Sequence, residues 1–79
     1  MEERIIGIVA EICGADTQDL SPDLDLFEEG LLDSFGALQL LVTLSESFGV
    51  DLDVSDVARE QVATVEKIEE LIAQRRAAV

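Results

Sequence analysis

The chain has 79 residues, and a domain this small buries only roughly 60% of the surface that its unfolded chain would expose. Its 18 acidic and 5 basic residues give a net charge of −13, which repels phosphates and anionic lipid headgroups and excludes nucleic-acid binding and stable membrane binding. The chain has no histidine, so it lacks both the usual general base of a nucleophile and the commonest zinc ligand. Its single cysteine excludes an internal disulfide framework. We therefore expect the chain to catalyse no reaction alone.

The first predicted helix covers residues 2–13 and ends at Gly14. Cys13 lies on its apolar stripe, which favours a buried packing role over a reactive thiol. Gly7 costs up to about 1 kcal/mol relative to alanine inside a helix, and this indicates a close contact with another helix. The rest of the stripe consists of Ile5, Ile8, Val9 and Ile12.

Residues 14–33 are predicted to form a long connection, because they contain Pro22, Gly30 and single aspartates without a sustained period. Connections longer than about 12 residues are uncommon unless they are functional or pinned to the rest of the fold. We therefore expect an ordered loop with one short turn of helix, held by buried apolar side chains. These are Leu20, Leu24, Leu26, Phe27, Leu31 and Leu32.

The second predicted helix is opened by Asp33, runs to Phe48 and stops at Gly49. Phe35, Leu38 and Val42 flank its core-facing stripe and add more apolar surface than a core needs, so we expect some of them to meet partners. The core-facing stripe itself consists of Ala37, Leu40, Leu41, Leu44 and Phe48.

Two further helices complete the prediction. Asp53 or Ser55 caps a short third helix that ends near Gln61, and Thr64 caps a fourth over residues 65–77. The predicted fold class is all-α: one domain over residues 1–79, a small four-helix bundle with three longer helices, a short third helix and a long loop between the first two.

Two features bear on location and assembly. No apolar run approaches the roughly 18 residues of a membrane span, and the charged start Met-Glu-Glu-Arg differs from a secretory signal. We therefore expect a cytoplasmic protein. Since no large apolar face is left unassigned, we also expect a monomer.

The most informative stretch is 27–36, FEEGLLDSFG, which brings Ser34 to the first turn of a helix at the end of a long loop. The hydroxyl should face solvent there, and Asp33 beside it can accept backbone N–H bonds where the helix dipole also favours a carboxylate. An Asp-Ser pair alone indicates only a helix cap. The evidence for a function of Ser34 comes from the wider pattern, which consists of residues 30–35, then Gln39-Leu40 and Phe48, in a short acidic chain.

This pattern resembles the acyl, peptidyl and D-alanyl carrier proteins, which share an Asp-Ser-apolar motif at the start of the second of four helices. The resemblance extends from about Ile5 to Ile72. It implies that Ser34 carries covalent 4′-phosphopantetheine, transferred from coenzyme A by a magnesium-dependent phosphopantetheinyl transferase, with Asp33 as its acidic neighbour. It also implies that the arm holds an acyl or aminoacyl group as a thioester, with no catalytic residue and no metal ligand in the chain.

The resemblance further implies where partner enzymes dock, because carriers use the second helix, the loop before it and the third helix. The implied contacts are Leu32, Phe35, Gly36, Leu38, Gln39, Val42, Val54, Val57 and Arg59. For the last three, an alternative interpretation is two core residues and a solvated charge. The net negative charge indicates enzymes with basic docking surfaces and salt-sensitive association.

The subclass is indicated by departures from the fatty-acid carriers, which usually have leucine after the serine and more acids along the second helix. The corresponding positions here are Phe35, Gly36, Gln39 and Ser45. The motif is closer to D-alanyl carriers and to the free-standing aminoacyl carriers of polyketide and nonribosomal peptide pathways, which serve antibiotic biosynthesis. Both receive an amino acid from a separate adenylating enzyme and pass it to an acyltransferase or synthase.

The choice between these two carriers depends on the third-helix region. D-alanyl carriers tend to have aromatic residues there, whereas this chain has Val57 and Val62. We therefore favour a carrier of an amino-acid-derived unit in polyketide or nonribosomal peptide biosynthesis. A D-alanyl carrier for teichoic acid D-alanylation is the alternative.

A different class of function is a divalent-cation-binding or acidic protein-docking module. The pairs Asp23-x-Asp25 and Asp51-x-Asp53 resemble the spacing of calcium ligands. An EF-hand loop, however, needs glycine at its sixth position and glutamate at its twelfth, and neither acidic segment has them. Within this class of function, the remaining possibilities are loose binding of divalent cations and docking of a basic partner.

Overall fold

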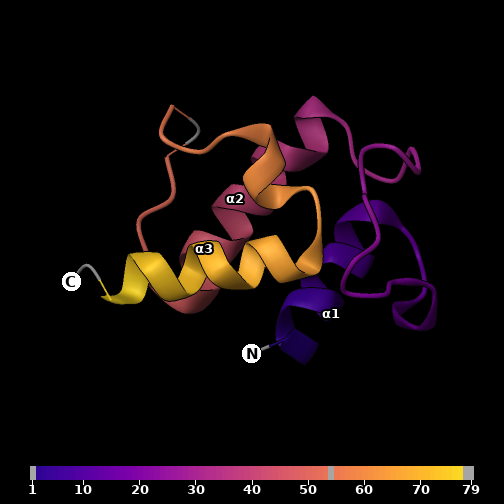
Figure 1. The fold of residues 1–79 in the computed structure, drawn as a ribbon, viewed down its shortest axis with the longest axis horizontal. Helices are drawn as coiled ribbons and strands as arrows, with labels where there is room; N and C mark the ends of the chain where they lie inside the picture. Colours follow the sequence, from indigo (N-terminus) through magenta and orange to yellow (C-terminus); the bar gives the residue numbers. More distant parts are fainter. Residues whose placement is uncertain (1, 54, 78–79) are drawn as a thin grey trace.

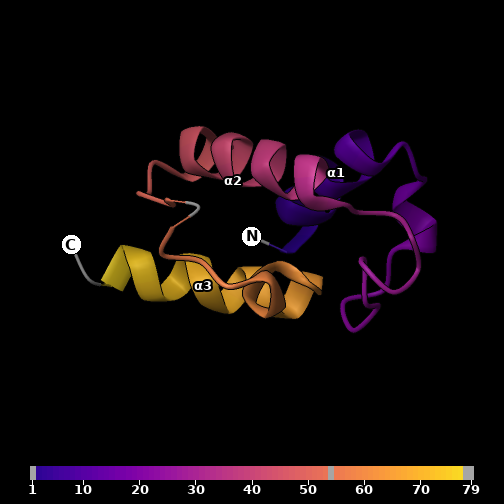
Figure 2. The same ribbon diagram turned by 90° about the horizontal axis from the view of Figure 1, so that it is seen from above.

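The computed structural model describes residues 2–53 and 55–77, and the regular elements within them are all helical. They are α1 (Glu2–Cys13), the 3-10 helix η1 (Thr17–Asp19), α2 (Ser34–Phe48), the 3-10 helix η2 (Arg59–Val62) and α3 (Val65–Ala77) (Figure 1). Helix α1 packs against both α2 and α3, and Figure 2 shows α2 above α3. None of these helices is long and apolar enough to cross a membrane. The predicted all-α fold is confirmed, as are the extents of the three longer helices.

The segment predicted as the short third helix begins as a turn. The carboxylate of Asp53 accepts hydrogen bonds from the backbone N–H and the hydroxyl of Ser55, both at 3.0 Å, and these bonds lower the pKa of Asp53. Helical geometry appears only in η2, where Oε1 of Gln61 accepts from the N–H of Ala58 at 2.8 Å. The short helix therefore starts later than predicted, because the Asp53 side chain closes a local turn instead of capping a helix.

One apolar core joins the three longer helices to the long loop, and no charged or polar side chain is buried in the part of the chain that the structure describes. Burying each large aliphatic side chain in this core stabilises the fold by about 1.5–3 kcal/mol. Gly7 does not approach another helix, since no atom lies within 4 Å of the position of a Cβ there, and that prediction is wrong. The fully excluded side chains are Ile5, Val9, Leu26, Leu40, Leu44, Val65, Ile68 and Ile72.

The loop between α1 and α2 is pinned as predicted. Leu20, Leu26 and Leu32 are buried in the core. The N–H of Leu26 donates to the carbonyl of Ala63 at 2.8 Å, and the carbonyl of Leu26 accepts from the N–H of Leu32 at 3.0 Å. The first bond holds the loop against the segment before α3, and the second closes the loop on itself, so the start of α2 has a fixed position.

The C-terminal end of α2 is closed by Gly49, as predicted. This residue has a left-handed backbone with φ of 65°, which a glycine adopts without the steric cost that a Cβ would add. Its N–H donates to the carbonyl of Ser45 at 3.0 Å, and the Ser45 hydroxyl donates to the carbonyl of Val50 at 2.6 Å. The chain therefore turns away sharply after α2.

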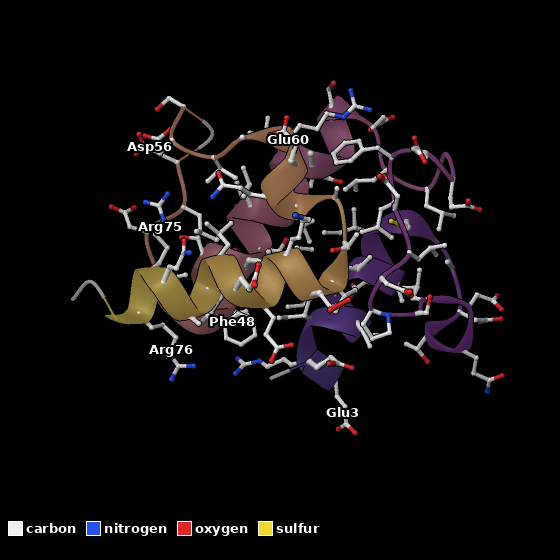
Figure 3. All side chains as sticks on the ribbon, viewed as in Figure 1. Glu3, Phe48, Asp56, Glu60, Arg75 and Arg76 are labelled. Atoms are coloured by element: carbon white, nitrogen blue, oxygen red, sulfur yellow. The ribbon has the colours of Figure 1, made fainter. Side chains whose placement is uncertain are left out.

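Two arginines join distant parts of the acidic chain. The Arg4 guanidinium lies 4.7 Å from the centre of the Phe48 ring and donates to the carbonyl of Ser47 at 2.6 Å, which ties α1 to the end of α2. Arg75 points from α3 toward the loop that carries Asp56 (Figure 3). Each guanidinium thus lies against a backbone carbonyl oxygen, and that of Arg4 also lies against an aromatic ring.

Replacing Leu26 by alanine should lower the free energy of unfolding by about 2–5 kcal/mol, because it empties a fully buried site that anchors the loop. Leu38→Ala, the same chemical change at an exposed position, should cost less than about 1 kcal/mol. Urea unfolding followed by circular dichroism measures both. Equal losses in the two variants would contradict the anchoring role of Leu26.

Candidate attachment site

Ser34 is the first residue of α2, and its side chain is exposed. Asp33 before it is the N-cap: its backbone is extended, and Oδ1 accepts from the N–H of Gly36 at 2.7 Å. The carbonyl of Asp33 accepts from the N–H of Ala37 at 2.8 Å and starts the helical ladder. The carboxylate is thus turned onto the helix, and no hydrogen bond among the described residues engages the Ser34 hydroxyl. This hydroxyl is open to a modifying enzyme.

Gly36 allows the loop to pass close under the first turn of α2. A Cβ at this position would lie 3.0 Å from Cδ1 of Leu32 and 3.2 Å from Oδ1 of Asp33. Leu32, which the family resemblance implies as a partner contact, is only 5% exposed. Its side chain therefore supports the attachment site from inside the core, and we do not retain it as a docking residue.

The exposed face of α2 next to Ser34 is apolar. Phe35 is 69% exposed, Leu38 45% and Val42 53%, and the side chain of Gln39 is also exposed. Leu38, Gln39 and Val42 also line a groove of about 560 Å³ between α1 and α2. An apolar face of this kind on a very acidic chain is a candidate surface for transient contacts.

A second, smaller pocket of about 180 Å³ has Ser34 at its edge. Its lining also includes Leu38 and Leu41 of α2, Val57 from the segment that leads into η2, and Arg59 at the start of η2. The structure therefore brings Val57 and Arg59 close to the attachment residue, as the resemblance implies. Val54, the remaining proposed contact in this segment, lies outside the described residues.

The rim of this pocket contains an interaction that the sequence did not reveal. The Arg59 guanidinium lies over the ring of Phe27, 4.2 Å from its centre. The sequence predicts Phe27 only as a loop anchor, and the residue is half-buried against the core. The two residues are far apart in the sequence, and no periodicity links them, so only the folded chain shows that they meet at the pocket.

Cys13, at the end of α1, is half-buried against the core. Burial raises its pKa, and the negative charge of Asp33 raises it further. Because the thiolate is the reactive form, a raised pKa makes this thiol less reactive at neutral pH. The packing role predicted for Cys13 agrees with this environment.

Within residues 2–53 and 55–77, no group of three or more acidic, histidine or cysteine side chains is arranged to hold a metal ion. Two of the aspartates with calcium-like spacing act in local turns instead. Oδ1 of Asp25 accepts from the N–H groups of Phe27 and Glu28, both at 3.1 Å, and Asp53 caps the turn at Ser55. The described residues give no support to the cation-binding alternative.

Comparison with known proteins gives this geometry a context. The family described as "Phosphopantetheine attachment site" matches residues 3–72. The chain belongs to this family. It is a carrier protein, and 4′-phosphopantetheine is its covalently attached cofactor, as the resemblance predicted. An exposed serine hydroxyl at a rigid helix start, with room around it, fits such a group.

Among similar curated proteins, a D-alanyl carrier protein from Lacticaseibacillus rhamnosus is 43% identical over 68 residues, covering 86% of this chain and 84% of that protein. A D-alanyl carrier protein from Bacillus velezensis is 36% identical over 67 residues, covering 85% and 86%. A solution NMR structure of a holo acyl carrier protein from Nitrosomonas europaea has a TM-score of 0.76 at 17% identity, over 99% of this chain and 96% of that one. The last comparison shows that the fold is shared.

Replacing Asp33 by alanine should lower the free energy of unfolding by about 1 kcal/mol, because the N–H of Gly36 loses its acceptor. Asp33→Asn keeps an oxygen in the same place and should recover most of that loss. Urea unfolding of the three proteins measures the difference. If the asparagine variant were as unstable as the alanine variant, the charge rather than the hydrogen bond would be the source of the effect.

Proposed function

We propose that this carrier holds its cargo as a thioester on a 4′-phosphopantetheine arm attached to Oγ of Ser34. The observation that carries the proposal is the position of Ser34 in the first turn of α2, exposed, with Asp33 turned onto the helix and away from the hydroxyl. The family match over residues 3–72 includes this position.

The chain's own residues position the hydroxyl and leave the chemistry to other enzymes. The chain has no histidine, and the Asp33 carboxylate beside Ser34 accepts from the N–H of Gly36, so we assign the base that removes the hydroxyl proton to the phosphopantetheinyl transferase. The positive end of the α2 dipole favours the negative phosphodiester that results. The arm supplies a terminal thiol, which forms the thioester. In this proposal the chain itself is not an enzyme. Residues 1–79 act as one carrier domain, which is monomeric and cytoplasmic.

Partner enzymes dock on the exposed face of α2 and on the segment before η2. The proposed contacts are Phe35, Gly36, Leu38, Gln39, Val42, Val57 and Arg59. The proposed partners are the phosphopantetheinyl transferase, an adenylating enzyme that activates the amino acid, and an acyltransferase or synthase. The net charge of −13 supports basic docking surfaces on these enzymes.

The proposed cargo is a small aminoacyl group. The pocket of about 180 Å³ beside Ser34 is smaller than the roughly 300–1,000 Å³ of sites that bury drug-sized ligands, which supports a short cargo over a long acyl chain. The two relatives described above are named D-alanyl carrier proteins, and this favours D-alanine. Val57 and Val62, in place of aromatic residues, support an amino-acid-derived unit of polyketide or nonribosomal peptide biosynthesis as the second candidate.

Incubation with coenzyme A, magnesium and a broad-specificity phosphopantetheinyl transferase should add one phosphopantetheine to the wild-type chain. Intact-mass spectrometry measures the gain, and peptide mapping should place it on Ser34. Ser34→Ala should show no gain, with the free energy of unfolding changed by less than about 0.5 kcal/mol because the side chain is exposed.

The control variant is Ser47→Ala, which removes another hydroxyl from the same helix and should be loaded like the wild type. A folded wild-type chain that gained no mass would refute the carrier function. Loading of Ser34→Ala would refute the assignment of the attachment residue alone.

If the first cargo candidate is right, incubating the holo protein with a D-alanine-adenylating enzyme, D-alanine and ATP should form a D-alanyl thioester, with release of AMP and pyrophosphate. The readout is an intact-mass gain that hydroxylamine removes, because thioesters react with it. Adenylating enzymes for other amino acids provide the comparison. Loading only by an enzyme that adenylates another amino acid would favour the biosynthetic-pathway carrier. Loading by no adenylating enzyme, the D-alanine enzyme included, would contradict the aminoacyl cargo.

A further inference from the structure

Arg59 is the one charged residue among the described residues that line the pocket beside Ser34. The other lining side chains, apart from Ser34 itself, are apolar. In a chain with 18 acidic and only 5 basic residues, it is unusual that the charged side chain at this pocket is an arginine. Its position calls for a physical explanation other than solubility.

The ring of Phe27 holds the Arg59 guanidinium over the loop that leads to α2. A guanidinium that stacks on an aromatic face keeps its N–H donors directed outward in its own plane, where they can pair with an oxyanion. The stack also restricts the long side chain, so less conformational entropy is lost when an anion binds. Arg59 is thus preorganised to receive negative charge next to Ser34.

Negative charge appears at this place when the arm is attached. The new phosphodiester, joined to Oγ of Ser34, would carry one negative charge shared by its two non-bridging oxygens, next to the residue that bears the Asp33 carboxylate and within a chain whose net charge is already −13. Like charges at short range oppose one another, and a nearby cation offsets the repulsion. The helix dipole of α2 supplies part of this compensation, and Arg59 lies where it can supply more.

We infer that Arg59, stacked on Phe27 across the pocket from α2, binds the phosphodiester of the arm attached to Ser34 and thereby stabilises the holo protein. This inference rests on the proposed function, because it requires the arm to be on Ser34. It assigns Arg59 a positioning role toward the cofactor, in addition to its proposed role as a partner contact.

The test compares melting temperatures of the apo and holo forms of each variant, so that any change in the apo fold cancels. Attachment should raise the Tm of the wild type more than that of Arg59→Gln, by roughly 1–8 °C for an exposed charge pair in a domain of this size. Arg59→Lys should keep part of the difference. In 1 M salt the difference should largely disappear, because the Debye length falls to about 3 Å.

The matched control is Arg76→Gln, which makes the same change in net charge far from the pocket. Figure 3 shows Arg76 pointing outward near the end of α3, on the opposite side of the molecule from Glu60 of η2. The holo-minus-apo difference in Tm of this variant should equal that of the wild type. Equal reductions in Arg59→Gln and Arg76→Gln would assign the effect to net charge and overturn the inference.

A second measurement observes Arg59 directly. In ¹H–¹⁵N spectra of the wild type, the Nε–H resonance of Arg59 should shift between the apo and holo forms, whereas that of Arg76 should not. An unshifted Arg59 resonance, or the same holo-minus-apo Tm difference in the wild type and Arg59→Gln, would overturn the inference while the mass gain on Ser34 still supported the carrier function. No mass gain at all would overturn both.

Discussion

The packing of the long loop beneath the first turn of α2 is the constraint on which the rest of the structure depends. Leu26 is fully buried and hydrogen-bonds the loop to the segment before α3, and Leu32 lies close against Gly36. These contacts fix the position at which α2 begins. Because Ser34 is the first residue of that helix, the same contacts fix the direction in which its hydroxyl faces solvent.

The longer helices could be predicted because their signals are local. Asp33 and Gly49 mark the ends of α2, and Thr64 caps α3 by accepting from the N–H of Lys67 at 3.1 Å. Each of these signals depends on the chemistry of one or two neighbouring residues. The short third helix was less predictable, because Asp53 can cap either a helix or a turn, and the fold decides between them.

The attachment residue could be proposed from the sequence, whereas its surroundings could not. Ser34 is recognisable by its motif, but the burial of Leu32 depends on how the loop crosses under α2, and the contact of Arg59 with Phe27 depends on how η2 folds back. Periodicity in one segment carries no information on contacts between segments distant in the chain. The sequence pattern therefore singles out a candidate for the modified residue, but it does not indicate which residues surround that candidate.

The charge distribution supports the proposal that this carrier docks in turn with several enzymes. Its acids give a long-range attraction to basic partners, which raises the rate of encounter but weakens with salt, so complexes can form and separate quickly. The exposed apolar face around Leu38 and Val42 adds short-range contacts without requiring a large buried interface. The role inferred for Arg59, which lines the pocket beside Ser34, is different: its positive charge would balance the negative charge of the arm. In the functions proposed for them, the acidic surface and Arg59 thus act at different ranges, the acidic surface on partner enzymes and Arg59 on the cofactor.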